Sequence, residues 1–276
     1  MSYSAGHSDQ HAVSGSDRLL LLGRGDKPVV FLHGLFGTPE HWRSVMGAMA
    51  DDYRLVALQL PLDRRPDRRS EGIKSLDDLI DFVARTIFSL DLPPVVMCGN
   101  SLGGLVSIEM CLRYPERVAG LVLAGSAGIF ERSLTSGERP KPSREFVRSI
   151  AVDIFADEAL ITDEMVEDWY QSVLDRDYVR FLLRISRATR DWRVGDDLRR
   201  LDLPTLIVWG RDDKVTPPAV AEEFKSKIAN SRLEFIEACG HAPSLEQPVI
   251  FTEMLRRFLP DCFAPHPIMS IGAAMV

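Results

Sequence analysis

Residues 94–104 read PVVMCGNSLGG, an apolar run followed by small residues and the start of a helix-forming segment. An apolar run of this length, bounded by proline and glycine, is typical of a strand that is buried on both faces. The segment 102–113 has helical spacing and stops before Tyr114-Pro115, because a residue that precedes proline disfavours the helical conformation. The stretch therefore predicts a buried strand, a tight turn at Ser101 and a helix over 102–113.

The same alternation of strand and helix extends outward in both directions. Further apolar runs, bounded by Gly, Pro or charged residues, predict strands at 28–34, 53–60, 118–125, 204–210 and 232–238. Segments of helical period lie between them, and Ser75 is placed to cap one such helix, with Asp77 and Asp78 in its first turn. This pattern predicts an α/β fold with a mostly parallel, doubly wound sheet.

One long interval breaks the alternation. About seventy residues, 131–200, carry only helical periods, which predicts an inserted helical cap. We therefore expect a core made of 18–130 and 201–262, a disordered polar N-terminal tail at 1–17 and a C-terminal tail at 263–276.

Composition and charge limit the partners. The 276 residues include 40 acidic and 33 basic side chains, and the net charge of −7 disfavours nucleic acids and anionic membranes. No apolar run reaches the ~18 residues of a membrane helix, and no secretory signal is present, so a cytoplasmic location is expected by default. A small-molecule substrate is the expected partner, and the oligomeric state is left open, with a homodimer as one option.

The four cysteines have no metal-like spacing, so we expect free buried thiols and neither a metal nor a cofactor: Cys98, Cys111, Cys239 and Cys262.

The turn after the decisive strand carries the pattern G-x-S-x-G, at Gly99 to Gly103. A tight turn between a strand and a helix strains its central residue, and glycines two positions away allow a close approach of the backbone. Ser101 would then be presented at the start of a helix, whose dipole favours developing negative charge. These features predict Ser101 as a nucleophile.

A serine hydroxyl needs a base with a pKa near 7, and that base needs a partner to fix its tautomer. Two downstream loops supply these groups directly after predicted strands: Asp212 and Asp213 follow 204–210, and His241 follows 232–238. Catalytic groups of open α/β sheets gather at the carboxyl ends of the strands, so the three loops are expected to converge. The residues alone do not decide between Asp212 and Asp213.

Four motifs together resemble the α/β-hydrolase superfamily over about residues 18–260: HGLFG at 33–37, GNSLGG at 99–104, WGRDDKVTP at 209–217, and GHAP at 240–243 with Glu246 and Pro248. The order Ser, Asp, His agrees with that fold. The resemblance implies Ser101 as nucleophile, His241 as general base and Asp213, rather than Asp212, as the orienting acid. It also implies an oxyanion hole made of the backbone N–H groups of Leu35 and Leu102, with Phe36 as the alternative to Leu35.

Three functions remain as hypotheses. The first is hydrolysis of a small carboxylic ester through an acyl-enzyme on Ser101, with Phe36 and Trp169 as candidate lining of the substrate pocket. The second is hydrolysis of a carbon–carbon bond in a vinylogous diketone, although HGLFG and Ala242 depart from the pattern of such enzymes. The third is a non-hydrolytic ligand receptor on the same fold. Serine at position 101, where dehalogenases and epoxide hydrolases have aspartate, argues against those two activities.

Overall fold

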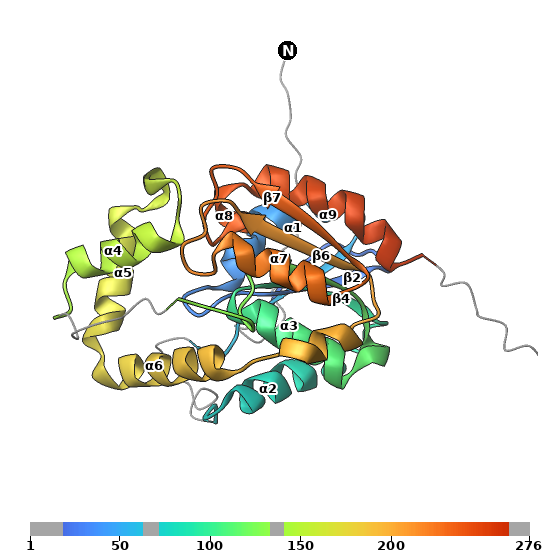
Figure 1. Cartoon of the computed structure of the whole chain (residues 1–276), viewed down its shortest axis with the longest axis horizontal. Helices are drawn as coiled ribbons and strands as arrows, with labels where there is room; N and C mark the ends of the chain where they lie inside the picture. The colour runs from blue at the N-terminus through green and yellow to red at the C-terminus, as the bar shows by residue number, and fades with distance from the viewer. Residues whose placement is uncertain (1–18, 63–71, 133–140, 265–276) are drawn as a thin grey trace, which may run out of the picture.

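The computed structural model describes residues 19–62, 72–132 and 141–264, so the predicted N-terminal tail and nearly all of the C-terminal tail lie outside the described residues. Seven strands form one sheet in the order β1-β3-β2-β4-β5-β6-β7 (Figure 1). Their bounds are β1 Leu19–Leu22, β2 Pro28–Leu32, β3 Arg54–Leu58, β4 Val95–Asn100, β5 Val118–Ala124, β6 Thr205–Gly210 and β7 Ser231–Ile236. All six predicted strands are present.

Two edge strands differ from the prediction. The run Leu19–Leu22 was not expected to form a strand, because leucine has no marked strand preference; it becomes β1 by antiparallel pairing with β3, in which Leu19 lies opposite Leu58. All other pairs are parallel. At the opposite edge, β7 is only partly buried, rather than enclosed on both faces, since only β6 pairs with it.

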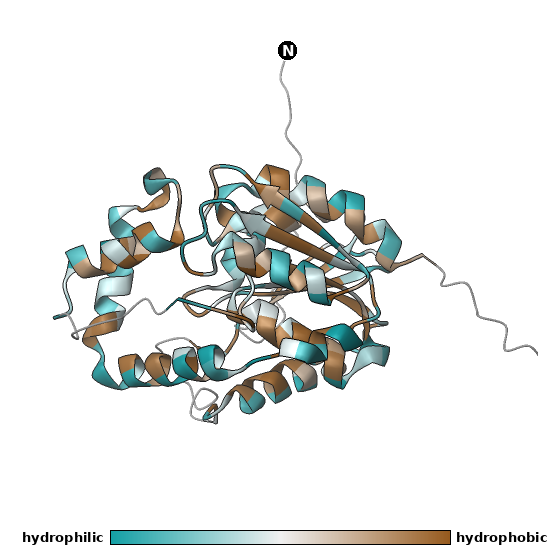
Figure 2. Ribbon diagram, in the orientation of Figure 1, coloured by the Kyte–Doolittle hydropathy of each residue, from teal (hydrophilic) through white to brown (hydrophobic). Residues whose placement is uncertain are grey.

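Helices cover both faces of the sheet. One face packs against α1 (Arg43–Met49) and α9 (Pro248–Cys262) through one apolar cluster. The other packs against α2 (Leu76–Ser89), α3 (Leu102–Arg113) and α7 (Pro218–Lys227) through a second cluster. Figure 2 shows the result as helices that are hydrophobic on one side and hydrophilic on the other. The predicted fold class is confirmed.

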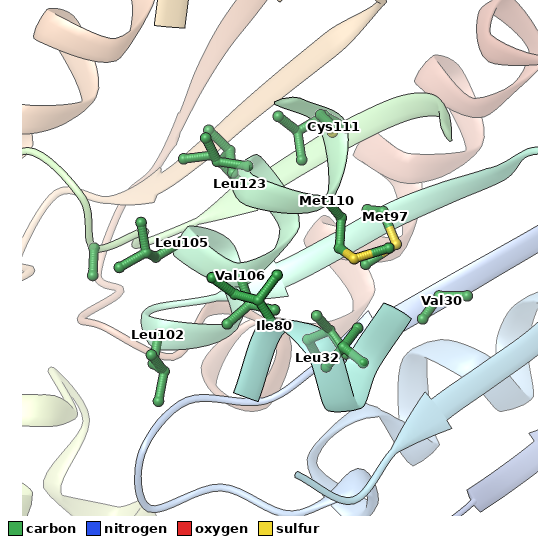
Figure 3. Close-up of a cluster of buried hydrophobic side chains, with 14 of the residues drawn as sticks. Val30, Leu32, Ile80, Met97, Leu102, Leu105, Val106, Met110, Cys111 and Leu123 are labelled. Carbon is green, nitrogen blue, oxygen red and sulfur yellow. The ribbon is translucent and has the colours of Figure 1, made fainter. Parts of the chain in front are cut away.

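The local signals for two of these helices are visible in the structure. The Ser75 hydroxyl accepts the N–H of Asp78, and the Asp78 carboxylate accepts the N–H of Ser75, which is a complete capping box. The helix α3 spans the predicted residues and is apolar almost all round, because it lies between the sheet and other helices (Figure 3). Its side chains interlock with those of β2, β4, β5 and α2: Val30, Leu32, Ile80, Met97, Leu102, Leu105, Val106, Met110 and Leu123.

Three helices, which we call the inserted helices, lie between β5 and β6 in the chain: α4 (Arg144–Ile154), α5 (Asp163–Leu174) and α6 (Arg176–Asp191). They occupy one side of the molecule (Figure 1). The helices α4 and α5 form a third apolar cluster of their own, which reaches the core at Val215 and Ala242. Whether residues 131–200 behave as a separate cap stays a prediction. The remaining short helices are η1 Pro39–Trp42, η2 Pro115–Arg117, η3 Glu158–Leu160, η4 Gly195–Arg200 and α8 Pro243–Glu246.

Candidate active site

Ser101 occupies a strained turn between β4 and α3. Its φ is +54°, a region that non-glycine residues rarely enter. The backbone passes so closely here that a Cβ on Gly99 would lie 2.2 Å from the Gly103 carbonyl oxygen, and a Cβ on Gly103 would lie 2.2 Å from that of Leu32. Both positions therefore require glycine, because a side chain would collide with a neighbouring backbone carbonyl oxygen. The turn holds the serine at the N-terminus of α3.

Asp213 and His241 form a buried pair at the ends of β6 and β7. His241 Nδ1 lies 2.8 Å from Asp213 Oδ2. The carboxylate also accepts the N–H groups of Val215 (2.9 Å) and Thr216 (2.8 Å) and the Thr216 hydroxyl (2.8 Å). Four hydrogen bonds fix the orientation of this carboxylate. Asp212, in contrast, is exposed and uses its backbone N–H to bond Cys239.

The electrostatic environment of His241 favours the protonated ring. Burial lowers the pKa of His241, but the charge and hydrogen bond of Asp213, together with the charges of Glu131 and Glu246, outweigh it, so the pKa lies above 6.5. An imidazole in this environment can accept a proton readily. Its Nδ1 faces Asp213, which leaves Nε2 as the atom that can act as a base.

Ser101 and His241 line the same cavity. No hydrogen bond joins the Ser101 hydroxyl to the imidazole among the described residues, and such bonds often tighten only when substrate binds. Asn100, directly before the serine, connects the two loops: its Nδ2 donates to the carbonyl oxygens of Ala124 (2.8 Å) and His241 (2.9 Å). No role for Asn100 is predicted from the sequence, because nothing in a single sequence reveals a contact across 141 residues.

Glu246 holds the histidine loop from the other side. Its carboxylate accepts the N–H groups of Gly240 (2.9 Å), Ala242 (3.1 Å) and Ala156 (2.8 Å). The His241 N–H itself donates to the carbonyl oxygen of Ile154 (2.7 Å). The loop that carries His241 is therefore hydrogen-bonded to the end of α4 and to the segment that follows it.

The two expected oxyanion donors lie beside the serine. The HGLFG segment forms a turn closed by the Gly37 N–H and the Gly34 carbonyl oxygen (3.0 Å). Leu35, the second residue of this turn, lines the cavity, and a Cβ on Gly34 would lie 3.1 Å from Ser101 Cβ. Neither the Leu35 nor the Leu102 N–H donates to another backbone group in the turns and caps of the described chain. Both remain candidates for an oxyanion hole.

His33 has a structural role in shaping this turn. It is buried, and its Nε2 accepts the Leu60 N–H (3.0 Å), so Nδ1 carries the proton that it donates to the Gly34 carbonyl oxygen (2.8 Å). Burial lowers the pKa of His33 to about 4. The ring is therefore neutral and connects the HGLFG turn to the segment that follows β3.

The cavity has a volume of about 120 Å³ and is lined mostly by apolar side chains. Phe36 and Trp169, the predicted lining of a substrate pocket, line this cavity and pack with ring centroids 5.4 Å apart. The same two side chains also line a neighbouring cavity of about 520 Å³. Three polar side chains, those of Glu131, Ser186 and Arg190, also line the first cavity. Sequence reasoning missed these three, because isolated polar residues in helical or loop segments are usually solvated.

Residues 19–62, 72–132 and 141–264 contain no helix long and apolar enough to cross a membrane. They also contain no group of three or more His, Cys, Asp or Glu side chains arranged to hold a metal ion. The four cysteines are free and buried.

Comparisons with known proteins agree with this arrangement. The model of the "Alpha/beta hydrolase family" matches residues 29–253. A 2-hydroxy-6-oxo-2,4-heptadienoate hydrolase of Pseudomonas putida is 30% identical over 256 residues, which cover 86% of this chain and 90% of that protein.

Two solved structures illustrate the range of similar proteins. A meta-cleavage product hydrolase from Pseudomonas fluorescens IP01 has a TM-score of 0.76 at 26% identity, covering 88% of this chain and 93% of that one. An esterase from Exiguobacterium antarcticum has a TM-score of 0.73 at 25% identity, covering 88% and 94%. The sheet, the strand–serine–helix turn and the family match lead to one conclusion: the chain belongs to the alpha/beta hydrolase family, and it is a hydrolase.

Proposed function

We propose that the protein is a serine hydrolase that cleaves carboxylic esters of small molecules through an acyl-enzyme on Ser101. The observation that carries this proposal is the buried Asp213–His241 pair, which opens on the same cavity as Ser101. A hydroxyl, an imidazole of raised pKa and an oriented carboxylate are the groups that acyl transfer requires. No cofactor enters the proposed reaction.

In the first half of the reaction, His241 Nε2 takes the Ser101 proton while Oγ attacks the acyl carbon. The carbonyl oxygen becomes an oxyanion, which the Leu35 and Leu102 N–H groups stabilise. Asp213 stabilises the imidazolium that forms. The tetrahedral intermediate then collapses: the carbon–oxygen bond to the alcohol breaks, and His241 returns its proton to the leaving oxygen.

In the second half, water replaces the alcohol. His241 takes a proton from the water, whose oxygen attacks the acyl carbon, and the second intermediate collapses with proton transfer back to Ser101 Oγ. The carboxylic acid leaves and the enzyme is restored. The inserted helices cover this chemistry in the proposal, since Ile150, Ile154 and Trp169 line the cavity.

Labelling with a fluorophosphonate, followed by peptide mapping, tests the nucleophile directly. We expect modification of Ser101 in the natural protein, loss of labelling in Ser101→Ala, and a burst of p-nitrophenol from short-chain esters. Labelling of another residue would contradict the proposed mechanism. A folded protein that binds small molecules but neither reacts nor turns over would instead favour a ligand receptor.

Hydrolysis of a carbon–carbon bond is the second candidate. It is favoured by the similarity to hydrolases of meta-cleavage products, at 26–30% identity. Such a reaction would use the same serine, histidine and aspartate. Turnover of a ring-fission dienoate, with no activity on a broad panel of esters, would replace the ester hypothesis by this one.

A further inference from the structure

One wall of the catalytic cavity is charged, although most of the lining is apolar. Glu131, Ser186 and Arg190, here called the polar wall, line the cavity together with Ser101 and His241. Arg190 donates from Nη1 to the Ser186 hydroxyl (2.7 Å), which fixes the direction of the guanidinium. The proposed mechanism uses none of the three.

Glu131 is the unusual member. Its Oε2 is buried and has no hydrogen-bond partner in the described part of the chain. Buried polar atoms are nearly always hydrogen-bonded, and an unpaired one is costly. Burial raises the pKa of Glu131, while the charges of His241 and Arg190 act in the opposite direction. A carboxylate on a cavity-lining residue, with one oxygen that no protein group pairs, is suited to a donor on a bound molecule.

The charges of the wall restrict what that molecule can carry. A substrate carboxylate would be attracted by Arg190 but repelled by Glu131. A substrate ammonium would be attracted by Glu131 but repelled by Arg190. Either ion would also lose its hydration on entering an apolar cavity. An uncharged group with both a donor and an acceptor satisfies both side chains at once, since four further guanidinium N–H groups of Arg190 remain as donors.

We propose that the polar wall binds an uncharged substrate group, a primary carboxamide or a hydroxyl, that donates to the Glu131 carboxylate and accepts from Arg190. The group lies at the end of the acyl part, with the ester carbon at Ser101. This inference rests on the proposed hydrolase function and narrows its substrate class. It makes Glu131 a specificity-determining residue.

Three p-nitrophenyl esters of equal size test the proposal: those of adipamic acid, adipic acid and 6-methylheptanoic acid. They end in a carboxamide, a carboxylate and an isopropyl group. In the natural protein we expect kcat/KM for the carboxamide to exceed that for each of the others by about tenfold. Glu131→Gln removes the repulsion of the carboxylate, so the adipic ester should gain about tenfold and reach the level of the carboxamide. Glu116→Gln, at an exposed position, is the matched control.

A preference for the carboxylate in the natural protein, or a carboxamide-to-carboxylate ratio that Glu131→Gln leaves unchanged, would overturn the inference. If Glu131→Gln does not fold, Arg190→Met replaces it and should abolish the preference for carboxamide over isopropyl. Titration calorimetry with hexanamide and hexanoate separates this inference from the proposed function. If no ester is turned over, tighter binding of hexanamide than of hexanoate that is lost in Glu131→Gln still supports the polar wall, whereas equal binding to the natural protein contradicts it.

Discussion

Asp212 and Asp213 are adjacent in the chain but lie in different surroundings. Asp213 is buried and bonds the imidazole, whereas Asp212 is exposed. We expect Asp213→Asn to lower kcat by about 10⁴-fold, the loss known when the orienting acid of a serine triad is made neutral, because the amide stabilises the wrong tautomer. Asp212→Asn is the matched control and should keep nearly full activity. Steady-state hydrolysis of p-nitrophenyl acetate measures both, and equal losses would contradict the assignment.

The charges around His241 predict its pH dependence. A general base must be neutral, so kcat/KM should rise with pH through the pKa of His241, which lies above 6.5. Glu131→Gln removes a negative charge that favours the imidazolium, so the pKa of His241 should fall and the acidic limb should move to lower pH. Glu145→Gln, on the exposed start of α4, should leave the limb in place. Measured pH profiles that coincide for all three proteins would contradict this electrostatic coupling.

The loop that follows β7 depends on one carboxylate. Glu246→Ala would leave the N–H groups of Gly240, Ala242 and Ala156 without their acceptor. We expect the free energy of unfolding to fall by about 2–4 kcal/mol and kcat to fall as well, because His241 loses its support. Urea titration and ester kinetics check the two effects. The control Glu253→Ala, on the exposed side of α9, should change neither quantity. If Glu246→Ala also leaves both unchanged, the loop does not depend on the Glu246 carboxylate.

The elements that the sequence predicts well are those whose signals are local. The strand β4, the turn at Ser101 and the helix α3 follow from an apolar run, two glycines and a proline at 115. The strand β1 was missed because four leucines become a strand only by pairing with β3. Asn100 was missed for the same reason, because its contact with the His241 carbonyl oxygen joins residues far apart in the chain. Glu131 and Arg190 were missed because only the folded topology brings them to the same cavity.

The molecule as a whole contains apolar clusters of unequal size. The two that flank the sheet are large, whereas the third belongs to α4 and α5 and reaches the core at few residues. Because local stability follows buried apolar contact, the inserted helices α4 and α5 should open at a lower free energy than the central strands. Native-state hydrogen exchange measures both regions in one experiment.

The same experiment connects stability to function. Ile150, Ile154 and Trp169 belong to the third cluster and also line the cavity. A phosphonate bound covalently to Ser101 fills that cavity, so exchange in 144–174 should slow by at least about tenfold, while exchange in β4 and β5 should change little. Exchange of α4 and α5 at the rate of the central strands, unaffected by the phosphonate, would mean that these helices are part of the rigid core. Slower exchange in the phosphonate complex would show that occupation of the cavity stabilises α4 and α5.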